Sequence, residues 1–300
     1  MTALSLKRIY QDKLNTVVMI MALTLVITTP LIIFASLYTK SSMLFASDHS
    51  LWDLLFSSAW EPTKGKFGFL PFIISSIEIT ILSVIIAAPI CFLVAIHLTQ
   101  YAKHWFVKIM YPVTDILAGI PSVVYGVWGI LVVVPLVSDV IAPFFGIQTT
   151  GYTLLTGAIV LSIMIIPFIL NILIEILNTV PFELTEAGLS LGSTRWQVIK
   201  HIILKKAKPG IISAFGLGIA RAFGETIAVL MVAGNVIKIP DGLFSASYPL
   251  PALIANNYGE MMSIPLYDSA LMFGALILFV TIFLFNLVSR IVIYRLERSL

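Results

Sequence analysis

The chain has 300 residues, of which 59% are hydrophobic and 11% are charged, and its formal net charge at pH 7 is +3. Soluble domains carry about 25% charged residues, and a mean hydropathy of +1.03 lies far above their range, so a soluble globule is excluded. The charge pattern gives no support to nucleic-acid binding. The single cysteine, Cys91, lies in an apolar run, which excludes a disulfide framework or a cysteine cluster for a metal. We expect no metal and no cofactor.

Six apolar runs are long enough to cross about 30 Å of hydrocarbon as helices. They are expected near residues 15–38, 70–98, 108–138, 151–177, 210–236 and 267–294. Strands are excluded because backbone groups in lipid must be satisfied internally, and the runs lack the alternation of a barrel. The first run follows basic residues, as in a signal peptide, but it is longer than a signal's apolar stretch of about 7–15 residues. We predict an all-α integral membrane protein with one transmembrane domain over 1–300.

Lysine and arginine gather on one side of the predicted spans. Thirteen of them lie in the terminal segments and in the loops after the second and fourth spans. Only Lys40, Lys64, Lys66 and Lys238 lie in the remaining loops. Because cytoplasmic loops carry the excess of Lys and Arg, this pattern predicts two cytoplasmic termini, with loops 39–69, 139–150 and 237–266 outside.

The longest internal loop, 178–209, has the pattern of two short amphipathic helices. Gly192 is expected to end the first helix, and Thr194 with Gln197 has the spacing of a capping box that opens the second. The residues expected to share one face are Leu184, Ala187, Gly188 and Leu191 in the first helix, and Trp196, Ile199, Ile202 and Ile203 in the second.

Two interpretations of this helix-turn-helix remain open. It could lie on the headgroups, with Lys205, Lys206 and Lys208 attracted to anionic lipid. Alternatively, it could be a rigid knob that inserts into a groove of a cytoplasmic motor protein.

The predicted span 210–236 carries two charges, Arg221 and Glu225, one helical turn apart and therefore on one face. Small residues recur at every fourth position in two rows on opposite faces, which predicts close packing between neighbouring helices. These rows are Gly216, Ala220, Gly224 and Ala228, and Gly210, Ala214, Gly218 and Ala222. The two charges could pair to fix the rotation of the helix. Alternatively, Arg221 could offer planar donors to a passing oxyanion, with Glu225 competing for it.

The helix-turn-helix resembles the "EAA" coupling motif of ABC importer permeases. Glu186, Ala187 and Gly188 stand at its first three positions and Gly192 at its glycine. Ile202 and Leu204 stand at its Ile-x-Leu. Two residues depart from the motif: Gly188 replaces an alanine, and Lys205 replaces a proline. The resemblance implies that this loop docks on a separate ATP-binding subunit. The chain has no G-x-x-x-x-G-K-[ST] loop and is not expected to hydrolyse ATP.

Four further stretches resemble the C-type (PstC) subunit of the phosphate-specific ABC permeases, and together they cover most of the chain from about 67 to 295. They are FGFLPF at 67–72, GIPSVVYG at 119–126, RAFGETIAV at 221–229 followed by Gly234 and Asn235, and IANNYGE at 254–260. By this resemblance, the functional Arg and Glu of the family are Arg221 and Glu225. Glu78 has no recognised counterpart in the family, and Asp115 is expected to be an interfacial or capping residue.

The resemblance implies a type I ABC importer permease in the cytoplasmic membrane that takes up inorganic phosphate. Its implied partners are an A-type permease subunit, a dimer of ATP-binding subunits and an extracytoplasmic phosphate-binding protein. Within the same class, the substrate could be another oxyanion or a small solute. From a different class, the chain could be a channel or a secondary transporter that works alone. The sequence has no nucleophile elbow and no paired general acid and base, so it gives no support to an enzymatic function.

Overall fold

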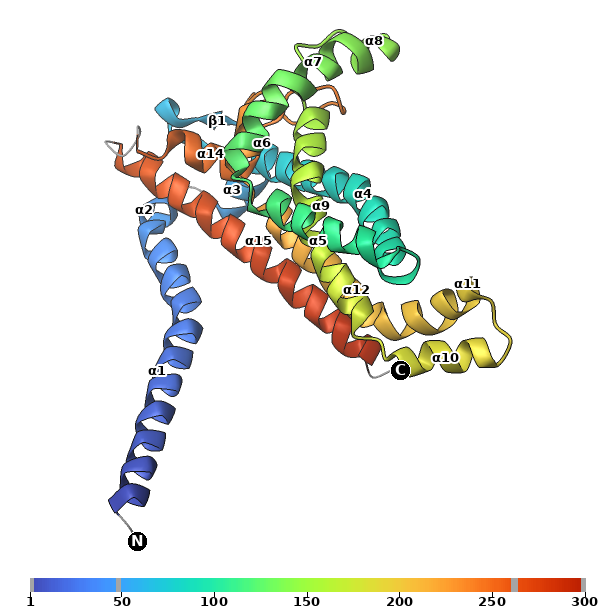
Figure 1. Cartoon of the computed structure of the whole chain (residues 1–300). Coiled ribbons are helices and arrows are strands. Elements are labelled where there is room, and N and C mark those ends of the chain that lie inside the picture. Colours follow the sequence, from blue (N-terminus) through green and yellow to red (C-terminus); the bar gives the residue numbers. More distant parts are fainter. Residues whose placement is uncertain (1–2, 47–49, 260–263, 298–300) are drawn as a thin grey trace.

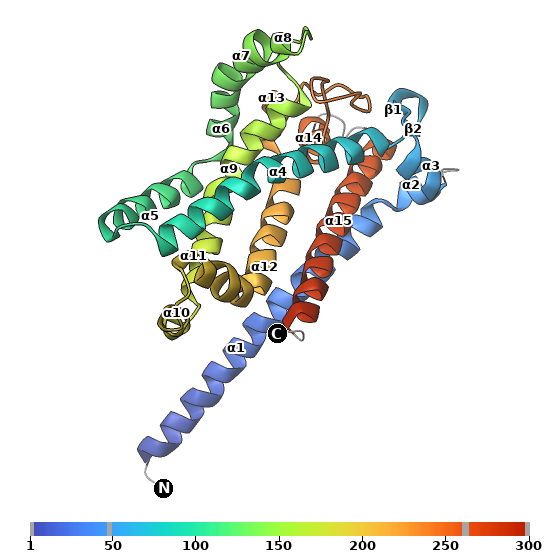
Figure 2. The same ribbon diagram turned by 90° about the vertical axis from the view of Figure 1, so that its right-hand side faces the viewer.

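The computed structural model describes residues 3–46, 50–259 and 264–297. In this part of the chain the regular secondary structure is helical apart from a short hairpin and one isolated bridge. Figures 1 and 2 show long helices that run between two ends of the molecule. One end carries α10 (Phe182–Ser190) and α11 (Arg195–Val198). The other, which we call the hairpin end, carries β1 (Trp60–Glu61) and β2 (Lys66–Phe67).

Five of the described helices are long and apolar enough to cross a membrane. Four of them confirm the spans predicted near 15–38, 70–98, 151–177 and 267–294. These four are α1 (Ala3–Lys40), α4 (Leu70–Gln100), α9 (Leu154–Asn178) and α15 (Pro265–Glu297). The fifth covers Ser122–Phe144.

The predicted span 108–138 is wrong as a single helix. A separate helix, α5 (His104–Gly119), ends at the GIP sequence, where Ile120 has an extended backbone with a ψ of 128°. The proline that follows Ile120 disfavours helical geometry at the preceding residue, so a new helix begins at Ser122. This helix contains two π-helical turns, each directly before a short segment that contains a proline. Its parts are α6 (Ser122–Trp128), η2 (Gly129–Val133), α7 (Val134–Leu136), η3 (Val137–Ile141) and α8 (Ala142–Phe144).

The predicted span 210–236 is not one of the five apolar helices and is divided into two. Its first part belongs to α12 (Leu204–Phe223), and its second part is α13 (Ile227–Val232). Three lysines lie in the first turns of α12 and Arg221 lies in its last turn, so the helix is less apolar than the five spans. The prediction of one uninterrupted helix through this region is therefore wrong.

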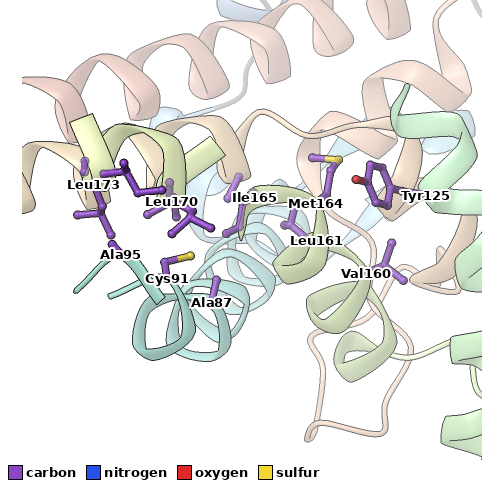
Figure 3. Close-up of a cluster of buried hydrophobic side chains, with 14 of the residues drawn as sticks. Ala87, Cys91, Ala95, Tyr125, Val160, Leu161, Met164, Ile165, Leu170 and Leu173 are labelled. Carbon is purple, nitrogen blue, oxygen red and sulfur yellow. The ribbon is translucent and has the colours of Figure 1, made fainter. Parts of the chain in front are cut away.

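The core of the bundle is built around α9, in which 67% of the most apolar 18-residue stretch is buried. It packs along α4, α5 and α12. On α4 the contact runs through small residues, since Ala87, Cys91 and Ala95 are fully buried and face α9 in Figure 3. Small side chains let two backbones approach closely. Cys91 is thus a packing residue whose thiol lies 3.5 Å from the carbonyl oxygen of Ile166.

An aromatic cluster closes the hairpin end. The Trp60 ring packs edge-on against the rings of Phe69 and Phe72, with centroid distances of 5.2 and 5.0 Å. Within the hairpin, Lys64 Nζ lies 2.7 Å from the carboxylate of Glu61, and its hydrogen bond lowers the pKa of that carboxyl below its usual value. Three short helices surround the cluster: α2 (Ser42–Ala46), α3 (Leu51–Phe56) and α14 (Leu250–Asn257). Glu260, at the end of the IANNYGE stretch, lies outside the described residues.

Candidate functional site

The two charges of the predicted passage lie on either side of a break between α12 and α13. The last helical residue of α12 is Phe223, and Gly224 is its C-cap. Glu225 lies in the connection, where its carboxylate oxygen Oε1 accepts a hydrogen bond of 3.2 Å from the backbone N–H of Ala228. This N–H lies in the first turn of α13, where unpaired N–H groups and the helix dipole favour a negative charge. Glu225 therefore caps α13 instead of continuing α12.

Arg221 lies in the last turn of α12 and is exposed. Its guanidinium carbon is 4.6 Å from the ring centroid of Phe168 on α9, a cation–π contact. No ion pair within 4.0 Å joins Arg221 to a carboxylate of the described residues. The expectation that Arg221 and Glu225 share one helical face is wrong, because the helix ends between them. The guanidinium N–H groups remain available to another acceptor.

Small residues place α12 between two other helices. A Cβ atom at Gly216 would come within 2.5 Å of the Ser289 hydroxyl on α15. A Cβ atom at Gly218 would come within 2.5 Å of Cδ1 of Ile169 on α9. These two glycines belong to the two different rows of small residues. Ala220 is half-buried, and the nearest atoms to a Cβ at Gly224 would be 3.7 Å away, so these two positions are less tightly packed.

Glu225 also lines a small pocket of about 10 Å³ between α4, α9 and α13. Two hydroxyl residues of α4, Ser76 and Thr80, line the same pocket. The Ser76 hydroxyl donates to the Phe72 carbonyl and accepts from the Leu250 N–H at 2.8 Å each. Glu225 is thus the one ionisable side chain among the described residues that line this pocket.

Two other carboxylates of the predicted spans lie on α5 and α4. Asp115 of α5 accepts a hydrogen bond of 2.9 Å from the Asn171 side chain of α9 and is exposed. This hydrogen bond joins two packed helices, which fits a structural role for Asp115. Glu78 is half-buried on α4.

The predicted helix-turn-helix is present, and we call residues 182–203 the arm. It consists of α10, a turn at Gly192, α11 and the π-helical turn η4 (Ile199–Ile203). Gly192 has a φ of +82°, in the left-handed region that favours glycine. The capping box is confirmed: the Thr194 hydroxyl accepts from the Gln197 N–H at 3.3 Å, and the Gln197 side chain accepts from the Thr194 N–H at 2.8 Å.

The coupling residues lie on two sides of α10. Gly188 is buried against the second half of the arm, whereas Glu186 and Ala187 are exposed. The exposed apolar side chains next to them include Leu191, which is 86% exposed, and Trp196, which is 52% exposed. Trp196 was expected on the same side as Ile199 and Ile203, but these two are buried and Trp196 is not. Ile199 and Ile203 pack into the core of the bundle together with Val198, so the packing of the arm decides which of its apolar side chains are covered.

A pocket of about 460 Å³ lies between the arm and the ends of α4 and α9. Gln100, Asn178 and Arg195 are among the polar residues that line it. The guanidinium carbon of Arg195 lies 5.1 Å from the ring centroid of Tyr101, which follows α4. The arm is therefore held to the bundle mainly at its second half, through Val198, Ile199 and Ile203.

Sequence reasoning missed two features of this site. The ring under Arg221 comes from Phe168, on another helix, and no local pattern pairs these positions. No proline follows Phe223 closely enough to indicate that the helix ends there. The sequence Gly224-Glu225-Thr226 does offer one signal, because a carboxylate two residues before an apolar segment is typical of a helix start.

Residues 87–300 match the family described as "Binding-protein-dependent transport system inner membrane component". The chain is 36% identical over 258 residues to the phosphate transport system permease protein PstC of Xylella fastidiosa, covering 81% of this chain and 79% of that one. It is 41% identical over 240 residues to the probable ABC transporter permease protein YqgH of Bacillus subtilis, covering 79% and 76%.

The fold is also found in a crystal structure of a bacterial ABC transporter involved in the import of the acidic polysaccharide alginate. The TM-score is 0.62 at 15% identity, with 94% of this chain and 98% of that chain covered. At this identity the likeness concerns the fold alone. Membership of such a family implies a multi-pass inner-membrane location and partners that bind solute and hydrolyse ATP. The chain therefore belongs to the binding-protein-dependent ABC transporter permeases, within which it is PstC-like, and it is a transport subunit and not an enzyme.

Proposed function

We propose that this chain is the permease subunit through which an ATP-driven importer moves inorganic phosphate across the cytoplasmic membrane. The observation that carries the proposal is the similarity to phosphate permeases over about four fifths of the chain. The geometry at the break between α12 and α13 also supports this proposal. Arg221 is the group best suited to a tetrahedral oxyanion, because its planar fork of N–H donors matches two oxygens at once, and no carboxylate of the described residues pairs with it.

In this proposal Arg221 attracts the anion and Glu225 limits how tightly it is held. Transport requires a site that binds well enough to admit a solute and weakly enough to release it. The carboxylate of Glu225 lies four positions along the chain and is held at the start of α13. Its negative charge lowers the local attraction for an anion, which favours release.

The arm docks on an ATP-binding subunit in this proposal. Glu186, Ala187 and the exposed Leu191 form the contact, and buried Gly188 with left-handed Gly192 keeps the two halves of the arm at a fixed angle. ATP binding closes the dimer of ATP-binding subunits, the arm moves with it, and the passage turns outward to receive phosphate. The remaining proposed partners are an A-type permease subunit and an extracytoplasmic phosphate-binding protein.

The proposed orientation places the arm, the start of α1 and the end of α15 in the cytoplasm. These segments lie at the same end of the molecule in Figure 1, opposite the hairpin. The arm carries Arg195 and Lys200, and α12 begins with Lys205, Lys206 and Lys208, all exposed. This distribution follows the bias of Lys and Arg toward the cytoplasmic side. The whole chain, 1–300, then forms one permease domain.

The test is uptake of labelled phosphate at micromolar concentration by host cells that lack this chain and all other phosphate carriers. We expect wild-type chain, supplied with its partner subunits, to restore uptake, and labelled sulfate uptake to stay at background. Restoration that persists without the ATP-binding subunit would identify a self-sufficient carrier instead. Restored sulfate uptake with no phosphate uptake would retain the permease and overturn the substrate.

A further inference from the structure

A stripe of polar side chains runs along one side of α5. The stripe consists of His104, Lys108, Tyr111 and Asp115. Their spacings of four, three and four residues place them on one side of a helix, and all four are exposed. Gly119, the last residue of α5, lies one helical turn after Asp115 and continues the same side.

Two hydrogen bonds place this stripe along α9. The Asn178 side chain, at the end of α9 next to the arm, donates to the Tyr111 hydroxyl at 3.2 Å. The Asn171 side chain donates to Asp115 at 2.9 Å. Asn171 lies seven residues before the end of α9, which is about 10 Å along the helix axis. The stripe therefore runs along α9 from its arm end into the membrane span.

The same side of α9 leads to Arg221. Phe168, whose ring lies under the Arg221 guanidinium group, is three residues before Asn171. Glu175 is four residues after Asn171 and is exposed. Residues at these spacings are neighbours on one side of a helix, so polar groups continue from Arg221 to the arm end of α9. We call these groups the α5–α9 seam, which consists of Tyr111, Asp115, Asn171, Glu175 and Asn178.

Lipid is a poor environment for this seam. Charged side chains within membrane spans are costly, and they almost always face the interior of a bundle or a water-filled cavity. Asp115 and Glu175 form no ion pair among the described residues, and the hydrogen bond from Asn171 uses only Oδ1 of Asp115. Both carboxylates are therefore best satisfied by water. A polar, exposed seam that is continuous with Arg221 fits the wall of a water-filled passage.

We propose that the α5–α9 seam lines the cytoplasmic half of the solute passage, from Arg221 to the arm. This inference rests on the proposed function, because it concerns the route by which the same anion leaves Arg221. The Asp115 carboxylate is held by Asn171, about one helical turn of α9 from Phe168. Its negative charge repels an anion that has left Arg221, and return of the anion from the cytoplasm is thereby disfavoured.

The test is thiol labelling in inside-out vesicles that contain the complete transporter. Gly119→Cys places a thiol on the polar side of α5, where a Cβ atom would meet nothing within 4 Å. The matched control is Leu117→Cys, two residues away on the opposite, apolar side, where the native side chain is 40% exposed. The single native cysteine, Cys91, is fully buried. We expect a small charged thiol reagent to label Gly119→Cys and to leave Leu117→Cys and Cys91 unlabelled.

Labelling of Gly119→Cys should also depend on the state of the transporter. In the proposed cycle ATP binding turns the passage outward, so the cytoplasmic half closes. Mg²⁺ with a non-hydrolysable ATP analogue should therefore prevent the labelling. A cysteine that is simply exposed to cytoplasmic water would be labelled in both states.

The charge of the seam is tested with two reagents of similar size and opposite charge. The cationic reagent should label Gly119→Cys faster than the anionic one, because the Asp115 carboxylate lies one helical turn away. Asp115→Asn keeps an oxygen that can accept from Asn171. It should lower the preference roughly threefold to tenfold, the effect of one charge at about 6 Å in water. A preference that Asp115→Asn leaves unchanged would overturn the role given to Asp115.

Three results would overturn the passage itself: no labelling of Gly119→Cys, equal labelling of Leu117→Cys, or labelling that the ATP analogue leaves unchanged. Should Gly119→Cys not accumulate, Tyr111→Cys, exposed on the same stripe, takes its place. Phosphate uptake by cells carrying the same variants is measured in parallel. Uptake without labelling means that the seam inference has failed and the proposed function stands. Absence of phosphate uptake by the wild-type transporter means that the proposed function itself has failed.

Discussion

Gly188 in α10 and Ile202 in η4 lie so close together that a Cβ atom on Gly188 would come within 2.7 Å of Cδ1 of Ile202. The neighbouring Val198 side chain would be 2.9 Å away. These contacts give a physical reason for glycine at a position where the EAA coupling motif has alanine. The two halves of the arm pack with no room for a methyl group between them.

Gly188→Ala is therefore expected to lower the melting temperature of the purified transporter, because crowding a well-packed contact costs about 1–3 kcal/mol, more than the helix propensity that alanine gains. Ile202→Val removes the Cδ1 atom that causes the closest contact. The cost of Gly188→Ala should be smaller in that background, by about 1 kcal/mol. An equal cost in both backgrounds would show that the contact with Ile202 is not the reason for glycine at position 188.

Gly192 tests the turn of the arm independently of packing. A Cβ atom there would meet nothing within 4 Å, but the φ of +82° is unfavourable for alanine. We expect Gly192→Ala to destabilise the arm by about 1–2 kcal/mol and Gly192→Asn to cost less. Gly242→Ala, in an equally open position without a positive φ, is the control and should be neutral in the same thermal assay.

Glu186→Arg should abolish coupled uptake without unfolding the permease, because Glu186 is exposed in the isolated chain and its carboxylate forms no ion pair among the described residues. The measurements are phosphate uptake and co-purification of the ATP-binding subunit, and both should be lost. Asp241→Arg reverses an exposed charge on loop 237–266, which is predicted to lie outside, and should leave co-purification of the ATP-binding subunit unchanged. Uptake that survives Glu186→Arg would place the docking contact elsewhere.

Arg221→Ala should reduce uptake by about tenfold or more, the effect of losing charged hydrogen bonds to an anion. Arg221→Lys keeps the charge but loses the planar fork, so it should restore only part of the rate. Phe168→Leu removes the ring under the guanidinium group and should lower uptake less than Arg221→Ala does. Full uptake by Arg221→Ala, with normal expression, would remove Arg221 from the passage.

Glu225 has two separable roles, as a cap and as a charge. Glu225→Gln keeps an oxygen that can accept from the Ala228 N–H, whereas Glu225→Ala loses the cap, at a cost of about 1 kcal/mol. If the charge controls release of the anion, Glu225→Gln should alter the uptake rate while the melting temperature stays unchanged. A glutamine variant with wild-type uptake, beside an unstable alanine variant, would show that capping is its whole role.

The positions of four membrane spans could be predicted because the hydropathy of a long apolar run is summed over many residues. No single contact therefore determines where such a span lies. The break at Ile120 also had a local signal, since the following proline disfavours a helical Ile120. The turn of the arm was predictable for the same kind of reason. Gly192 supplies the left-handed residue, and Thr194 with Gln197 supplies the cap.

The remaining features depend on contacts between distant parts of the chain. The break after Phe223 separates Arg221 from Glu225, although their spacing alone placed them on one face. The exposure of Trp196 and the burial of Ile199 depend on how the arm packs against the bundle, which helical periodicity does not specify. Phe168 lies 53 positions before Arg221 in the sequence, and only the packing of α12 against α9 brings the two together.

The second half of the arm is continuous with the helix that carries Arg221. From Arg195 to Phe223 the chain passes through α11, η4 and α12 without leaving helical geometry. In the proposed transport cycle, a displacement of the arm is therefore passed toward Arg221 along continuous helix, with no loop between the two.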